Sequence, residues 1–305
     1  MRIARLLTTT LLVLTFFCQP SFGQSKQKQF YEQWDSQDTA GIWSLIQSWY
    51  AEEPYNPDVY VGLFNYFAIQ VYEIEVKDEL QPLGNEWSCQ SYKPAQDSLL
   101  HYRCEKKKFQ EDEFKKAMKW VDKGIGLFPD RLDLQMGKAI LTKETAQWRI
   151  FESTIIRALQ NDDSLHHEWK WLREEPVAQS AVFFERSVQG LLYDLFEMKD
   201  SMGYQIIEAI SNEWLSIDPT SYTATSNIAS CEIIKGNYEY AIDILKRMIK
   251  SNDQDAVVFS NLAFCYVQLS QWKKAKNAYE KAMELDAGQA SYYQSQIDWI
   301  ESQKE

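Results

Sequence analysis

Near the C-terminus, apolar and small residues recur at the spacing of two successive helices. Each run keeps one helix face apolar, and a short polar break separates the two runs. The first run is Phe259, Leu262, Ala263 and Tyr266, and the second is Trp272, Ala275, Tyr279 and Ala282. Because alanine lets two backbones approach closely while large residues fill the space beside the crossing, the pattern predicts a helical hairpin over residues 256–289.

The same pattern occurs one repeat earlier, in residues 222–255. Equivalent pairs are Ser226 and Ser260, Asn227 and Asn261, Ala229 and Ala263, Cys231 and Cys265, and Ala241 and Ala275. This period and these residue types resemble the tetratricopeptide repeat, whose period is about 34 residues. The resemblance, which extends to exported bacterial proteins of this family, implies an all-α fold. It implies a right-handed α-solenoid of helix-turn-helix repeats and no known reaction.

Weaker helical patterns fill most of the remaining chain. Residues 24–75 predict N-terminal helical pairs, and residues 112–221 predict degenerate repeats of the same kind. The two clear repeats span residues 222–289, and residues 290–305 predict a capping helix. Since a single helical pair leaves its apolar face in water, we expect the pairs to stack and share one core.

Two stretches interrupt the period. Residues 76–111 contain Pro82, Pro94 and a charged run, and they predict an inserted loop or β-hairpin. Residues 162–181 form a second insertion, which holds two tryptophans. Insertions in repeat arrays map to loops on one face, which is often the binding face.

The cysteines fall into two kinds. Cys231 and Cys265 occupy the same position in adjacent repeats, where helices lie on the order of 10 Å apart, so we expect both to be free and buried. Cys89 and Cys104 lie together in the first insertion and are candidates for a disulfide. Such a bond would close a loop of about 15 residues and stabilise it by about 3 kcal/mol.

The N-terminus has the three-part pattern of a secretory signal. A basic start at Arg2 and Arg5 precedes an apolar run that ends at Cys18, and small residues follow up to Gly23. We expect residues 1–23 to be removed and the remaining chain to be periplasmic or extracellular, without an integral membrane segment. Lipid attachment at Cys18 is the alternative, although bulky residues stand before that cysteine.

The charge of the chain excludes some partners. Its 44 acidic residues exceed its 32 lysines and arginines, which gives a formal net charge of −12. Nucleic-acid binding depends on cations that meet phosphates, so nucleic acid is not expected as a partner, and anionic lipid is not expected for the same reason. A basic partner is permitted by this charge but not required.

The sequence lacks the motifs of the common catalytic sites. It has no glycine-rich phosphate loop, no Gly-x-Ser-x-Gly and no His-Glu-x-x-His, so we expect no enzyme and no cofactor. His166 and His167 are adjacent and would point about 100° apart on a helix, which does not form a metal site. Cys89, Cys104 and His101 are one ligand short of a closed structural zinc site.

The first helices of the two clear repeats carry the candidate binding residues. The positions expected to line the concave face are Thr223, Ser226, Ser230, Val257, Ser260, Phe264 and Val267. None of them is charged, which suits the backbone or an apolar side chain of a protein or peptide partner. Exposure to solvent, or cover by another part of the chain, is the alternative interpretation.

The resemblance also suggests a carboxylate clamp, because some tetratricopeptide domains bind a terminal carboxylate with asparagine and lysine on their first helices. Asn227 and Asn261 stand at a position where such an asparagine occurs. However, Val257 and Ser260 stand where basic residues would be needed. The clamp is therefore not expected in this chain.

The eleven tryptophans have two explanations. Four of them are at core-like helical spacing, which predicts packing, and these are Trp43, Trp120, Trp214 and Trp272. Trp169 and Trp171 in the second insertion are candidates for contact with a glycan if they are exposed. If they fold back, they fill the array where the period fails.

Three functional hypotheses follow. An exported scaffold that holds a protein or peptide on its concave face requires an exposed apolar stripe. A carbohydrate-binding helper requires Trp169 and Trp171 exposed side by side. An enzyme requires converging acidic groups or histidines with perturbed pKa values. The scaffold is the function that the sequence favours, whereas the partner and the oligomeric state are not defined by it.

Overall fold

The computed structural model describes residues 26–35, 39–95, 97, 99–171 and 175–303. The signal peptide expected at residues 1–23 and the alternative lipid site at Cys18 lie outside the described residues. Contacts divide the chain into two compact units. The first runs to Leu141 and includes Lys170–Glu175, and the second consists of Thr142–Trp169 and the chain from Pro176 onward.

The first unit is built from helices around an aromatic core. Its helices are α2 (Lys26–Asp35), α3 (Thr39–Glu52), α4 (Pro57–Ala68), α5 (Glu111–Leu127) and most of α6 (Leu132–Glu144). Pro57 at the first position of α4 and the Asn56 side chain, which accepts a hydrogen bond from the Asp58 backbone N–H (2.9 Å), fix where α4 begins. Buried Ile46 of α3 and Leu63 of α4 then belong to the same core cluster.

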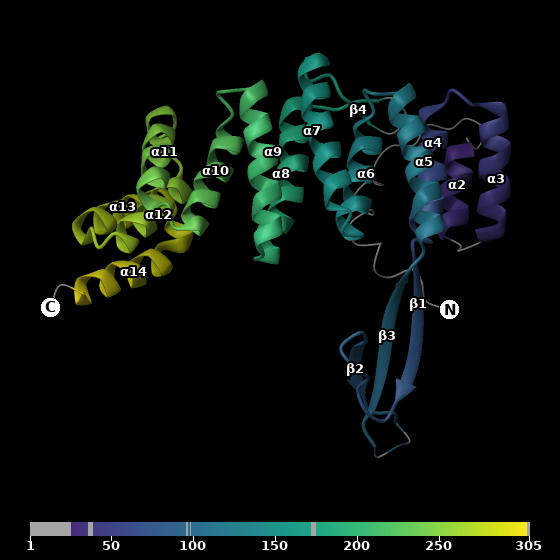
Figure 1. Ribbon diagram of the computed structural model, residues 1–305, viewed down its shortest axis with the longest axis horizontal. Helices are drawn as coiled ribbons and strands as arrows, with labels where there is room; N and C mark the ends of the chain where they lie inside the picture. The colour runs from purple at the N-terminus through teal and green to yellow at the C-terminus, as the bar shows by residue number, and fades with distance from the viewer. Residues whose placement is uncertain (1–25, 36–38, 96, 98, 172–174, 304–305) are drawn as a thin grey trace. The chain divides into compact units, whose positions relative to one another are not determined.

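A three-stranded antiparallel sheet interrupts the helices of this unit. Strands β1 (Tyr72–Glu79), β2 (Ser88–Tyr92) and β3 (His101–Phe109) pair in the order β1-β3-β2 and extend away from the helices (Figure 1). The insertion expected as a loop or hairpin at residues 76–111 therefore begins earlier, at Tyr72, and contains a third strand. The sequence of β1 did not indicate a strand, because most of its residues are exposed on both faces of the sheet and so show no apolar alternation.

A disulfide joins Cys89 of β2 to Cys104 of β3, which are direct cross-strand partners. Cys104 is completely buried, and the Lys77 ammonium group lies 4.6 Å from the centroid of the Trp87 ring. The small sheet is thus held by backbone pairing and a covalent link rather than by a core of its own.

A buried ionic network ties α4 to the start of α6. The Arg131 Nη2 atom donates to Asp58 Oδ1 (2.7 Å) and Asp133 Oδ2 (2.6 Å), and its Nε atom donates to Asp133 Oδ1 (2.9 Å). Arg131 is only 1% exposed. Burial acts to lower the pKa of Arg131, but hydrogen bonds and charge attraction from Asp133 and Asp58 outweigh it and raise that pKa. The guanidinium is therefore a fixed structural cation.

The second unit is a row of helical pairs. Its helices are α7 (Trp148–Ser164), α8 (Ser180–Met198), α9 (Ser201–Ile217), α10 (Tyr222–Lys235), α11 (Tyr238–Ser251), α12 (Ala256–Gln268), α13 (Trp272–Leu285) and α14 (Ala290–Ser302), with a short 3-10 turn, η3 (Ala287–Gln289), before α14. Consecutive helices from α10 to α14 pack against one another (Figure 1). A short ladder, β4 (Lys170–Trp171) with β5 (Glu175–Pro176), belongs to the segment between α7 and α8.

The pairs α10/α11 and α12/α13 form at the residues expected from the sequence. Gly236 ends α10 with φ +81°, a left-handed conformation that glycine adopts without strain, and it lets the chain reverse into α11. Ala263, Ala275 and Ala282 are completely buried where α12, α13 and α14 meet, and Tyr279 is 1% exposed beside them. The all-α fold of helical pairs with a small inserted sheet is therefore confirmed, while the handedness of the solenoid stays a prediction.

Cys231 and Cys265 are free and buried in α10 and α12. Burial raises the pKa of the Cys231 thiol to about 12 and that of the Cys265 thiol to about 11. Both thiols are therefore protonated at neutral pH and act as small apolar side chains. Within the described part of the chain, no helix has the length and apolar character needed to cross a membrane.

Candidate functional site

The predicted binding residues lie on two helices of the second unit. Thr223, Ser226 and Ser230 lie on α10, whereas Val257, Ser260, Phe264 and Val267 lie on α12. We call these seven residues the first-helix surface. The two helices are in contact with each other, so the set is a single region.

The α12 half of the first-helix surface is apolar and exposed. Asp255 caps α12 by accepting hydrogen bonds from the backbone N–H groups of Val257 (2.9 Å) and Val258 (3.3 Å). With α12 beginning at Ala256, the Val258 side chain lies in the core and the Val257 side chain is 62% exposed. Phe264, two turns further along, is 39% exposed, and its ring meets that of Tyr238 edge-on at 6.3 Å between centroids. Such exposed apolar residues are the anchors that a partner can cover.

The α10 half of the first-helix surface is polar and partly engaged within the chain. The Thr223 hydroxyl donates to a carboxylate oxygen of Glu185 on α8, and the Ser230 hydroxyl donates to the Ser226 carbonyl (3.0 Å). These hydroxyls are therefore weak candidates for direct partner contacts. The sequence did not indicate Glu185, because its helix does not follow the period of the two clear repeats.

The structure accounts for Asn227 without a carboxylate ligand. Asn227 is 3% exposed, donates to Gln189 Oε1 (3.0 Å) and accepts from Gln189 Nε2 (3.1 Å). This pair of hydrogen bonds occupies both ends of the amide. Asn227 thus joins α8 to α10, and Asn261 on α12 is half-buried.

Trp169 is not a ligand contact, which corrects its candidacy as an insertion residue that meets a glycan. It is 1% exposed and stacks on Phe184 with ring centroids 5.4 Å apart. Its Nε1 atom donates to Asp162 Oδ1 (2.6 Å), and Trp171 nearby is half-buried. The physical reason is that the indole packs on the Phe184 ring and donates its N–H to the buried Asp162 carboxylate, so both its apolar and its polar parts are satisfied inside the chain.

The other tryptophans assigned to packing are in or beside the core. Trp214 is 8% exposed, and Trp43 stacks on Tyr66 with centroids 4.9 Å apart. Trp120 and Trp272 are half-buried, and each ring contacts another aromatic ring. These side chains need no ligand to explain them.

Two of the three histidines contact carboxylates. His167 Nδ1 is 2.7 Å from Asp162 Oδ2, and His101 Nε2 is 2.6 Å from Asp97 Oδ2. His166 is exposed. Across the described ranges, no three side chains of histidine, cysteine, aspartate or glutamate are placed to hold a metal ion.

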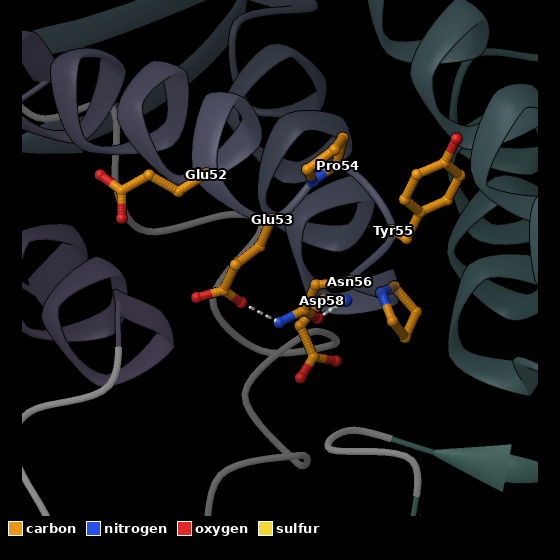
Figure 2. A pocket seen from close by; sticks show the side chains of 7 residues that line it. Glu52, Glu53, Pro54, Tyr55, Asn56 and Asp58 are labelled. Atoms are coloured by element: carbon orange, nitrogen blue, oxygen red, sulfur yellow. Dashed lines mark hydrogen bonds between the residues drawn. The ribbon is translucent and has the colours of Figure 1, made fainter.

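A separate pocket of about 580 Å³ lies at the turn between α3 and α4 (Figure 2). Its carboxylates have donors within the chain. Glu52 pairs with Lys26 (2.5 Å), Asp58 pairs with Arg131, and Glu53 accepts from Asn56 Nδ2 (2.6 Å) and Trp49 Nε1 (3.2 Å). These groups fix the turn, and Figure 2 shows the hydrogen bond between the Glu53 and Asn56 side chains beside Asp58.

The observed architecture defines a helical-repeat protein. The sequence profile of the tetratricopeptide repeat family matches residues 214–297, which covers α10 to α13 and their flanks. The similarity to the tetratricopeptide repeat family therefore covers that segment of the chain. No protein of curated function matches the chain.

Several solved structures are similar to this chain. One is MamA from Desulfovibrio magneticus RS-1, from residue 41 to its end, which is 19% identical to this chain with a TM-score of 0.35. The match covers 55% of this chain and 85% of the MamA chain. Another is a tetratricopeptide repeat protein from Parabacteroides merdae ATCC 43184, which is 14% identical with a TM-score of 0.39. The match covers 87% of this chain and 81% of that protein's chain. No functional statement follows from likenesses at this level.

Proposed function

We propose that this chain is an exported, non-catalytic scaffold that holds an apolar segment of a partner protein on the first-helix surface. The observation that carries the proposal is the exposure of Val257 (62%) and Phe264 (39%) on α12, one turn on either side of Ser260. The neutral Ser260 between them leaves room for a backbone. A segment that covered both apolar side chains would remove them from water at no cost in buried charge.

The expected contact can be tested by photo-crosslinking in the source cells. A benzophenone amino acid at position 264 is expected to form a covalent adduct with one partner protein. The same group at Tyr240, which is 54% exposed on α11, is expected to form none. Ser260→Arg should abolish the adduct, because a charged side chain then stands between the two anchors.

The purified partner then gives a quantitative measurement by calorimetry. Phe264→Glu is expected to weaken its binding by about 30-fold or more, as for a central anchor, whereas Tyr240→Glu should leave the affinity unchanged. Equal effects of the two substitutions, or an adduct at Tyr240 alone, would contradict the assignment of the first-helix surface.

Export is part of the proposal, and the Cys89–Cys104 disulfide supports it, because disulfides persist in oxidising compartments. In protein alkylated directly in cells and mapped by mass spectrometry, Cys89 and Cys104 are expected to be unlabelled. Cys231 and Cys265 should resist alkylation at pH 8, since their pKa values of about 12 and about 11 keep them protonated, and both should react after denaturation. Labelling of Cys89 and Cys104 in cells would indicate a reducing compartment.

A further inference from the structure

The outer side of α7 carries a groove that the first-helix surface does not include. The groove has a volume of about 380 Å³. Its lining residues are Arg149, Glu152, Ser153, Ile156, Arg157 and Gln160. These positions recur at intervals of three and four, so they share one face of α7, and we call them the α7 groove.

The rest of α7 explains why this face is open. Phe151, Ile155 and Ala158 are completely buried and turn the opposite side of the helix into the core. Gln160 Nε2 donates to Glu213 Oε1 on α9 (2.9 Å), which anchors the C-terminal end of the groove. The buried side thus packs α7 into the core while Arg149, Ser153, Arg157 and Gln160 remain exposed.

Two arginines of the α7 groove have no partner within the described part of the chain. Arg149 and Arg157 are exposed, and neither makes a hydrogen bond or ion pair with any residue that the structure describes. In contrast, Arg131 and Arg103 each bind carboxylates through two nitrogen atoms. Glu152 lies between the two arginines in sequence and pairs with neither. A chain with 44 acidic residues has thus left both guanidinium groups available.

We propose that the α7 groove binds an acidic, extended segment of a partner protein, with one carboxylate on Arg149 and another on Arg157. Eight residues of helix separate the arginines by about 12 Å. Four residues of extended chain span about 13 Å, so the two carboxylates belong four positions apart. In an extended chain the residue midway between them points to the same side, which places it over exposed Ser153, one turn before half-buried Ile156.

The geometry favours arginine-mediated recognition over general attraction. A guanidinium donates two parallel hydrogen bonds to one carboxylate, which gives specificity for carboxylates at a defined spacing. The net charge of −12 opposes the approach of an acidic segment at long range, so binding must come from these close contacts. The inference does not depend on the proposed function, because the two surfaces share no residue.

A labelled peptide with the core Glu-Thr-Leu-Thr-Glu is a direct probe, measured by fluorescence anisotropy against the full-length protein. Saturable binding is expected. The peptide Gln-Thr-Leu-Thr-Gln and the protein variant Arg149→Glu/Arg157→Glu should each weaken it by at least about tenfold. Arg247→Glu, which changes an exposed arginine on α11, should leave it unchanged, and so should Phe264→Glu.

Other outcomes would overturn the proposal. They are the absence of saturable binding, equal affinity for the glutamate and glutamine peptides, and an equal loss in Arg247→Glu. Self-association in sedimentation that disappears in Arg149→Glu/Arg157→Glu would assign the groove to a second copy of this chain and would also overturn it. The peptide comparison uses the unaltered protein, so it remains decisive if a variant folds poorly.

Discussion

Arg131→Ala is expected to lower the free energy of unfolding by about 3–5 kcal/mol. The substitution removes the cation that contacts both buried carboxylates, Asp58 and Asp133. Burial already raises the pKa of Asp133, and Arg131 acts in the opposite direction through a hydrogen bond and charge attraction. Without Arg131, each carboxylate must take up a proton or be exposed to water, and both alternatives destabilise the contact between α4 and α6.

Urea denaturation followed by circular dichroism measures this effect. Arg103→Ala is the matched control, because Arg103 also binds one carboxylate, Asp78, through two nitrogen atoms, but its side chain is 47% exposed. The control should hardly move the unfolding midpoint, since water replaces an exposed ion pair easily. Similar shifts for the two variants would show that the buried network contributes no more than a surface pair.

The repeats in residues 222–289 could be predicted because close packing restricts their residue types. Ala263, Ala275 and Ala282 are completely buried at helix crossings, where a larger side chain would force the helices apart. The left-handed turn at Gly236 imposes a similar restriction. Such positions recur in every repeat, and a period is therefore visible in a single sequence.

The features that the sequence did not predict depend on residues far apart in the chain. Asp58 and Arg131 are separated by 73 positions, and no local pattern connects them. Strand β2 was missed for the same reason. It is short and mostly exposed, so it has no apolar alternation in the sequence, and it forms by pairing with β3. Long-range contacts of this kind leave no period to recognise.

The candidate site was predictable only in part for the same reason. Val257 and Phe264 follow from the repeat, and the structure leaves both exposed. The contacts of Thr223 with Glu185 and of Asn227 with Gln189 both span 38 positions, which differs from the period of the two clear repeats. The irregular α8 therefore engages α10, including Thr223 of the first-helix surface, in a way that the repeat pattern does not indicate.

Trp169→Ala is expected to lower the free energy of unfolding by about 3–5 kcal/mol, as for other large aromatic residues removed from a core. The indole of Trp169 stacks on Phe184. The Trp169 carbonyl accepts a hydrogen bond from the Val177 N–H (3.0 Å), and the Trp169 N–H donates to the Ser180 hydroxyl (3.0 Å). Its removal leaves a cavity between α7 and α8. Replacing an exposed tryptophan that only binds a glycan would leave the free energy of unfolding almost unchanged. Urea denaturation therefore distinguishes the two interpretations.

Trp169→Phe separates the hydrogen bond from the packing. Phenylalanine keeps a ring against Phe184 but cannot donate to Asp162, which should cost about 1–3 kcal/mol at neutral pH. Burial raises the pKa of Asp162, while Trp169 and His167 oppose that shift, so the variant should raise this pKa further. A raised carboxyl pKa contributes stability that is lost as pH rises through it. The deficit of the variant should therefore shrink as the pH falls and Asp162 becomes protonated in both proteins. A deficit that is constant with pH would show that shape alone, and not the indole N–H, holds Trp169 in this position.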